Sequence, residues 1–275
     1  MIPAPFDYRR ADSLDEALAA LGEHGDDAKA LAGGHSLLPL MKLRLATPAV
    51  LVDIGRLADL SYVRADGDRI RIGALTRHRD LETSEVLARH APILAHVAGQ
   101  IGDPQVRHRG TIGGSLAHGD PASDLPAVCL ALGATFTVTG RSATRQVAAA
   151  DFFQGFLETA LGPDELLTEI SVPDVAGAGW SFQKFNRRAQ DWAIVGVAAV
   201  RNGTTGVGLI NMGPTPLRAA AVEAALAGGA SAEEAAEHAA DDLDPPADLN
   251  ASAEYRRHLA QVLVRRALEE AGSSH

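Results

Sequence analysis

Cysteine and long apolar runs are scarce in this chain of 275 residues. The single cysteine, Cys129, cannot form an intrachain disulfide, and it cannot by itself hold an iron–sulfur cluster, which takes about four cysteine thiolates. No apolar run approaches the ~20 residues that span a bilayer. The first residues lack the charged and apolar regions of a secretory signal. We therefore expect a cytoplasmic protein without a transmembrane segment.

The chain also lacks an excess of positive charge, since 25 Lys and Arg residues face 35 Asp and Glu residues and the net charge is −10. A protein that binds nucleic acid carries a basic footprint, so we expect no nucleic-acid partner. The two common nucleotide motifs, the Rossmann Gly-x-Gly-x-x-Gly pattern and the P-loop, are missing as well. A dinucleotide would have to be held by another architecture.

Two glycine pairs, Gly33-Gly34 and Gly113-Gly114, lie in apolar sequence beside a small hydroxyl residue. Glycine permits positive φ and a close approach of the backbone, so neighbouring N–H groups can converge on a phosphate. A single pair is more often a turn. Two pairs predict two backbone cradles for a long ligand with a diphosphate at its middle. We expect Gly33→Val or Gly113→Val to abolish ligand binding without abolishing folding.

Three polar side chains, His118, Ser123 and Asp124, follow the second pair and precede an apolar helix. Ser123 and Asp124 both suit the N-cap of that helix. For Ser123, capping and ligand contact are evenly balanced from the residues alone.

Hydrophobic periodicity predicts an α+β protein in three parts. Helices are expected over 13–24, 81–89, 92–101, 124–132, 216–240 and 254–271, and strands over 28–32, 50–54, 69–73, 135–139, 180–185, 193–201 and 207–212. The predicted units are an α/β unit over residues 1–55, a second α/β unit over 56–174, and an antiparallel sheet with packed helices over 175–275.

Motifs along nearly the whole chain resemble the FAD-binding medium subunit of the molybdenum hydroxylase (xanthine dehydrogenase) family. They are the first glycine pair within 31–38, the segments 101–107 and 166–173, and the second pair with its continuation to residue 126. Within that family, the resemblance is greatest to medium subunits of aerobic carbon monoxide dehydrogenases. It implies a vanillyl-alcohol-oxidase-type FAD-binding fold of two α/β subdomains, a C-terminal sheet with helices, and FAD held non-covalently.

The resemblance implies cofactor contacts at sixteen positions. The first glycine motif, with Lys29 just before it, would wrap the diphosphate, and the second would form another cradle. Three polar residues would face the ribityl or ribose hydroxyls, Leu167 would pack against the isoalloxazine or the adenine, and Lys184 would lie near the flavin. The full set is Lys29, Ala32, Gly33, Gly34, His35, Ser36, Leu37, Thr111, Gly113, Gly114, Ser115, His118, Ser123, Asp124, Leu167 and Lys184. For Asp124 the resemblance favours ligand contact over capping. The second motif of the family often carries Asn where this chain has Ser115, whose hydroxyl reaches less far.

Two further residues have alternative interpretations. In the wider fold a loop histidine can be joined covalently to FAD, but the resemblance favours a hydrogen-bonding or packing role for His35. Trp192 follows Arg187-Arg188 and could shield one face of the flavin or pack in the C-terminal core. The sequence favours no catalytic residue and no metal ligand.

The function implied by the resemblance is electron transfer. A large subunit with a molybdenum cofactor would oxidise the substrate, and a small subunit with two [2Fe–2S] clusters would pass electrons to FAD here. A quinone or NAD would be the external acceptor, and the complex would be a dimer of heterotrimers. Carbon monoxide is the favoured substrate, with aldehydes, purines and N-heterocycles open. Alternatives are a self-sufficient FAD oxidase or dehydrogenase, with His118 or His96 as its base, and a non-redox FAD-binding scaffold.

Overall fold

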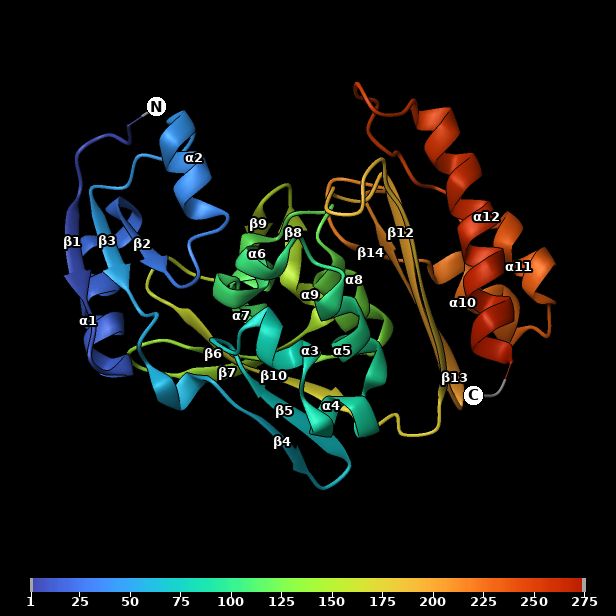
Figure 1. Cartoon of the computed structure of the whole chain (residues 1–275), viewed down its shortest axis with the longest axis horizontal. Coiled ribbons are helices and arrows are strands. Elements are labelled where there is room, and N and C mark those ends of the chain that lie inside the picture. Colours follow the sequence, from blue (N-terminus) through green and yellow to red (C-terminus); the bar gives the residue numbers. More distant parts are fainter. Residues whose placement is uncertain (1, 274–275) are drawn as a thin grey trace.

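A parallel three-stranded sheet forms the amino-terminal unit, at the left of Figure 1. The structure, a computed structural model, describes residues 2–273. The strands lie in the order β1 (Asp7–Arg10), β3 (Val50–Asp53) and β2 (Ala28–Leu31). Helix α1 (Leu14–His24) packs its buried stripe on them, and a short helix α2 (Leu37–Leu43) follows β2. Ser13 caps the start of α1, because its hydroxyl accepts a hydrogen bond from the Glu16 amide at 3.1 Å.

The middle unit is built on a five-stranded antiparallel sheet, in the order β4-β5-β10-β6-β7. Its strands are β4 (Val63–Asp66), β5 (Arg69–Gly73), β6 (Thr135–Thr139), β7 (Thr144–Ala148) and β10 (Leu166–Pro173). Between β5 and β6 the chain forms α3 (His78–Glu82), α4 (Glu85–His90), α5 (Pro92–Gly99), α6 (Pro104–Arg109), α7 (Ile112–His118) and α8 (Asp124–Ala131). A helical turn α9 (Ala149–Phe152) leads into the small hairpin β8 (Phe153–Gly155) and β9 (Glu158–Thr159).

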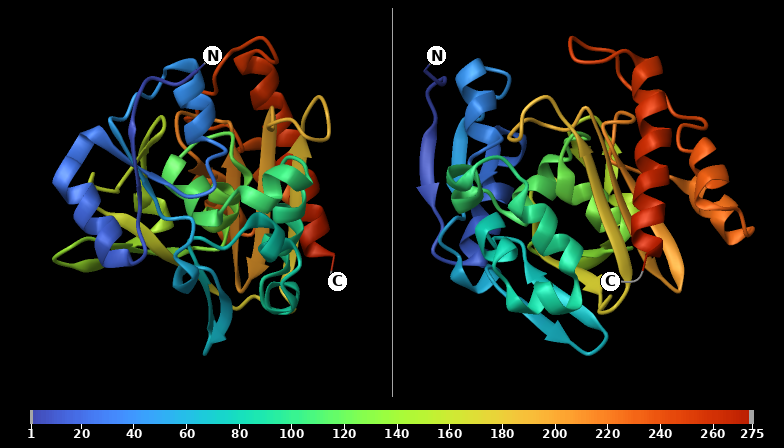
Figure 2. Two further views of the ribbon diagram at one scale, coloured as in Figure 1. Left: turned by 60° about the vertical axis from the view of Figure 1, so that its left-hand side comes forward. Right: turned by 45° about the vertical axis from the view of Figure 1, so that its right-hand side comes forward.

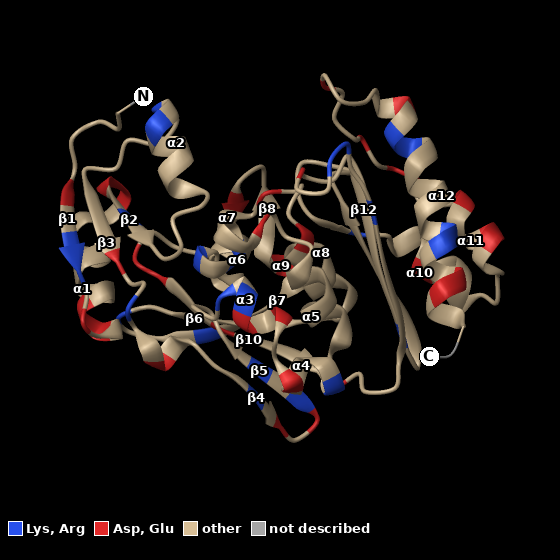
Figure 3. Cartoon of the chain, in the orientation of Figure 1, with Lys and Arg blue, Asp and Glu red and all other residues tan. Residues whose placement is uncertain are grey.

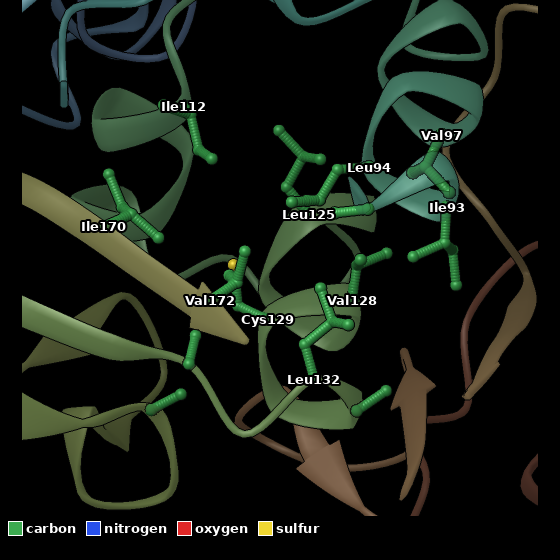
Figure 4. Packing of buried hydrophobic residues seen from close by; sticks show 14 of the residues in the cluster. Ile93, Leu94, Val97, Ile112, Leu125, Val128, Cys129, Leu132, Ile170 and Val172 are labelled. Atoms are coloured by element: carbon green, nitrogen blue, oxygen red, sulfur yellow. The ribbon is translucent and has the colours of Figure 1, made fainter. Parts of the chain in front are cut away.

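Helix α8 lies in the centre of the largest core. Figure 4 shows Leu125, Val128 and Cys129 of α8 between Ile170 of the middle sheet and the helix α5. Eight successive residues of α8 are buried, so this helix has no solvent-facing side. Cys129 is fully buried in this packing, which fits a small core residue.

The carboxyl-terminal unit is a four-stranded antiparallel sheet, β11 (Gly179–Phe185), β12 (Val195–Asn202), β13 (Thr204–Ile210) and β14 (Leu217–Arg218). One face packs on α8. The other face is covered by α12 (Ala253–Gly272), with α10 (Ala220–Ala227) and α11 (Ala232–Glu237) beside it (Figures 1 and 2). Alternate residues of β12 enter the two cores, with Val200 on the α8 side and Val197 on the α12 side. Helix α8 is therefore held between two sheets.

Three predicted elements differ in the structure. The helix predicted over 81–89 is two helices, α3 and α4, because Ser84 caps a new start through the Leu87 amide. The helix predicted over 216–240 is interrupted by Gly228-Gly229. The second glycine pair, predicted to form a backbone cradle, lies within α7.

Charges of both signs are interspersed over the elements seen in Figure 3. Among the described residues, no helix combines the length and the apolar character that crossing a bilayer requires.

Candidate functional site

A cavity of about 700 Å³ lies where the three units meet. This volume is within the range of small-molecule and cofactor sites. All sixteen residues that the sequence predicted as cofactor contacts line it: Lys29, Ala32, Gly33, Gly34, His35, Ser36, Leu37, Thr111, Gly113, Gly114, Ser115, His118, Ser123, Asp124, Leu167 and Lys184. The fold thus gathers around one space residues that are up to 155 positions apart in the chain.

The first glycine motif offers a run of free backbone donors. It connects β2 to α2, and Gly34 has φ +79°, the left-handed region that glycine favours. Within residues 2–273, the N–H groups from Gly33 to Leu37 donate to no acceptor. Successive unpaired amides around a left-handed residue form a concave site for an anion. This motif therefore has the donors that a diphosphate needs.

The second glycine motif is different, because its amides are already engaged. The Gly113 amide donates to the Ala74 carbonyl at 2.8 Å, the Gly114 amide to the Thr111 hydroxyl at 3.1 Å, and the Ser115 amide to the Thr111 carbonyl at 3.1 Å. Thr111 is thus the N-cap of α7. What this segment presents to the cavity is side chains rather than the backbone cradle expected from the sequence.

The first glycine of each pair is needed by the fold itself. A Cβ on Gly113 would lie 2.6 Å from both the Cβ and the carbonyl oxygen of Ala74. A Cβ on Gly33 would overlap the Arg109 carbonyl and lie 3.0 Å from the Cα of Gly110. The expectation that valine at these positions would spare folding is therefore wrong, because the close neighbours are protein backbone. The Gly33 contact with Arg109 and Gly110 also brings the first motif beside the start of the second.

A buried histidine that the sequence did not indicate lies beside Ser115 of the second motif. His78, at the start of α3, lines the cavity and is 3% exposed. Burial lowers the pKa of its imidazole to about 4, so the ring is neutral at pH 7. Its Nε2 lies 3.4 Å from the Ser115 hydroxyl. No local pattern could have indicated this contact, because the two residues are 37 positions apart.

An ion pair closes the cavity on the side of the carboxyl-terminal sheet. Lys184 of β11 donates from Nζ to Oδ2 of Asp124 in the first turn of α8, at 2.7 Å, and both side chains are buried. The other oxygen, Oδ1, has no partner within residues 2–273. Burial raises the pKa of the Asp124 carboxyl, and Lys184 opposes that shift. Ser123 occupies the N-cap position of α8, but its side chain makes no capping hydrogen bond, which leaves its hydroxyl available to the cavity.

The remaining predicted residues differ in exposure. Lys29 and His35 are exposed, whereas Leu167 is buried. His118 is half-buried, and desolvation lowers the pKa of its ring. Trp192 is 58% exposed and lines the cavity, so it does not pack in the C-terminal core.

His96, the other base considered for a self-sufficient oxidase, does not line this cavity. Its ring lies 5.1 Å from that of Trp180, and its Nε2 is 2.6 Å from the side-chain amide of Gln100. Among residues 2–273, no group of three or more His, Cys, Asp or Glu side chains is arranged to hold a metal ion.

Two protein families match this chain in succession. Residues 4–175 match the family described as "FAD binding domain in molybdopterin dehydrogenase", and residues 180–271 match "CO dehydrogenase flavoprotein C-terminal domain". The carbon monoxide dehydrogenase medium chains of Hydrogenophaga pseudoflava and Afipia carboxidovorans are 44% and 43% identical, each over 98% of both chains. The solved structure of carbon monoxide dehydrogenase from Hydrogenophaga pseudoflava, in a form that lacks the Mo-pyranopterin moiety of its molybdenum cofactor, superposes with a TM-score of 0.95. It shares 45% identity over 98% of both chains.

Proposed function

This chain belongs to the family of FAD-binding flavoprotein subunits of molybdopterin dehydrogenases, and on that premise we propose that it relays electrons through FAD to an external acceptor. The electrons come from [2Fe–2S] clusters in a small partner subunit. A large partner subunit with the molybdenum cofactor oxidises the substrate, which we propose to be carbon monoxide because the two relatives above are carbon monoxide dehydrogenase medium chains.

The hydrogen-bond donors and acceptors that line the cavity suit FAD. The free amides from Gly33 to Leu37 suit a diphosphate, and the unpartnered Oδ1 of Asp124 is an acceptor suited to a ligand hydroxyl. Leu167 supplies an apolar wall for a ring system. We propose the sixteen lining residues named above as contacts of FAD. Bound FAD supplies the redox chemistry, while the chain binds, orients and tunes it.

The observation that carries this proposal is the run of free amides at the first glycine motif, inside a chain that matches a flavoprotein subunit from end to end. A subunit that only relays electrons must hold its cofactor in a fixed position. It needs no side chain that activates a substrate. The chain's own residues therefore have a positioning role: they hold the dinucleotide across the junction of the three units and shield it from water.

The test is to express this chain alone and together with its proposed large and small partners, and to assay dye reduction by carbon monoxide. We expect activity only from the three-chain complex, with a mass that corresponds to a dimer of heterotrimers. A complex assembled without this chain is the matched control: carbon monoxide should reduce the centres of the two partner subunits once, and no turnover with the dye should follow. Anaerobic reduction of the flavin by substrate in the isolated chain would instead support a self-sufficient oxidase.

The acceptor is tested in the same complex. A quinone analogue and NAD are offered separately, since both remain candidates for the electrons that leave FAD. We propose that the complex works in the cytoplasm, which fractionation of cells that express it would check.

A further inference from the structure

His78 is fixed against two neighbours in the cavity wall. Its backbone amide donates to the Gly110 carbonyl at 3.0 Å. A Cβ on Gly110 would lie 2.6 Å from Cδ2 of the imidazole and 2.7 Å from its Nε2, so the edge of the ring touches the glycine directly. The same Nε2 lies 3.4 Å from the Ser115 hydroxyl oxygen. The ring therefore has little freedom, and its Nε2 is held toward Ser115.

The neutral ring carries one N–H proton, on either Nδ1 or Nε2. Its position decides whether the Ser115 hydroxyl can donate a hydrogen bond to a ligand. With the proton on Nε2, the ring donates to Ser115 Oγ, and the hydroxyl proton is free to point elsewhere. With the proton on Nδ1, the Ser115 hydroxyl would donate to the ring and present only lone pairs to the cavity. Nδ1 is buried and has no partner within residues 2–273. A ligand oxygen at Ser115 favours the first arrangement, because only that one provides it with a donor.

The second glycine motif has few other donors to offer. The amides of Gly113, Gly114 and Ser115 all bond within the protein, and the Thr111 hydroxyl caps the helix. Among residues 111–115, Ser115 Oγ is then the polar group that can still be aimed at a ligand. Arg77 and Arg107 are arginines whose charges act on the His78 ring. Their guanidinium groups donate to the Arg109 and Gly55 carbonyls and to Glu82 with the Ile101 carbonyl, respectively.

We propose that His78 is a positioning residue for the cofactor: it donates from Nε2 to Ser115 and so directs the Ser115 hydroxyl proton at an oxygen of the bound dinucleotide. The role rests on the FAD site proposed above, but not on the electron relay. It gives the second motif one oriented hydroxyl donor in place of a backbone cradle. The serine and the histidine thus act as one unit, although they come from different helices.

The experiment compares two amide replacements of His78. Glutamine places its side-chain NH₂ near the position of Nε2, whereas asparagine is too short to reach Ser115. FAD affinity is measured by flavin fluorescence in the assembled three-chain complex after removal of flavin. We expect His78→Gln to stay within about twofold of wild type. We expect His78→Asn and Ser115→Ala each to weaken binding about tenfold, as for the loss of one hydrogen bond to a charged group.

The double variant His78→Asn/Ser115→Ala decides whether the two residues act together. We expect it to bind FAD no worse than Ser115→Ala alone, since the histidine acts through the serine. The ³¹P resonances of bound FAD should shift in His78→Asn and Ser115→Ala and stay in place in His78→Gln. Additive losses of affinity, or a His78→Asn variant that loses only thermal stability while its FAD affinity and ³¹P spectrum stay as in wild type, would overturn the proposal. A wild-type complex that takes up no FAD would overturn the site itself.

Discussion

Lys184 reaches from the first strand of the carboxyl-terminal sheet to Asp124 at the first turn of α8, and its ammonium group lies 2.7 Å from the carboxylate. The two side chains are 8% and 5% exposed, so this charge pair is almost completely desolvated. Removing a charge from water costs several kcal/mol, and a partner at hydrogen-bond distance offsets that cost. The pair joins the last unit of the chain to the cavity wall built by the middle unit.

Lys184→Met should destabilise the chain by about 3–5 kcal/mol, because it leaves the Asp124 carboxylate buried without its partner. The double variant Lys184→Met/Asp124→Leu should recover most of that loss, since apolar residues of similar size often replace a buried pair without cost. Urea unfolding of the FAD-free chain measures both. A single variant as stable as wild type would show that the pair contributes no stability.

Gly113→Ala should lower the stability of the fold by about 1–3 kcal/mol, since its Cβ would press on Ala74 and force a backbone shift. The matched control is Gly114→Ala in the same helix. Its Cβ would meet only the Thr111 hydroxyl, the end of a side chain that can rotate, so a loss of at most about 1 kcal/mol is expected. Thermal melts without FAD distinguish the two, and equal losses would contradict this account.

Stability should fall in mild acid because of His78. Its pKa is about 4 in the folded chain, against about 6.5 when unfolded, so the unfolded state binds the proton first. The stabilisation is complete above pH 6.5, decreases as the pH falls, and is lost below about pH 4. The difference amounts to about 3 kcal/mol. Unfolding free energies at pH 7 and 4.5 should therefore differ less in His78→Gln than in wild type. An equal pH dependence would contradict a buried neutral imidazole.

Trp192 should become protected when FAD binds, because it lines the cavity and is largely exposed without a ligand. The chain has two tryptophans, so Trp180→Phe leaves Trp192 as the fluorophore. Iodide should quench this variant strongly without FAD and weakly with it. Trp192→Phe is the control, since Trp180 does not line the cavity and its quenching should respond little to FAD. Unchanged quenching of Trp192 would place it outside the cofactor site.

Acid precipitation of the flavin-loaded complex should release all FAD into the supernatant, because we expect no covalent bond to the chain. His35 is exposed and lines the cavity, so His35→Ala should remove at most one contact and leave the amount of FAD bound at saturation nearly unchanged. Flavin that stays in the pellet, attached to a peptide that contains His35, would contradict non-covalent binding.

The sequence predicts much of the fold because its strands carry strong periodic signals. Residues 69–73 and 135–139 alternate apolar and polar side chains and form β5 and β6 with the predicted bounds. The helix around the second glycine pair is not predicted from the sequence, because paired glycines usually mark a turn. Here the cap at Thr111 and the contact with Ala74 make helix α7 stable despite its two glycines.

Some residues of the candidate site can also be predicted from the sequence, and others cannot. Residues within a motif, such as those from Gly33 to Leu37, can be predicted from sequence because the conformation that leaves their amides free is local. The proposed role of His78 depends on a contact with Ser115 across two helices, and the pairing of Lys184 with Asp124 spans 60 positions. Such contacts follow from packing, which single-residue patterns do not encode.

The cavity is complete only when the last part of the chain is present. Both glycine motifs precede residue 120, but the wall that carries Lys184 and Trp192 comes after residue 180. Lys184 lies on β11, in the same sheet that covers one face of α8. Loss of the residues from β11 onward would therefore remove one side of the cavity and one side of the largest core together.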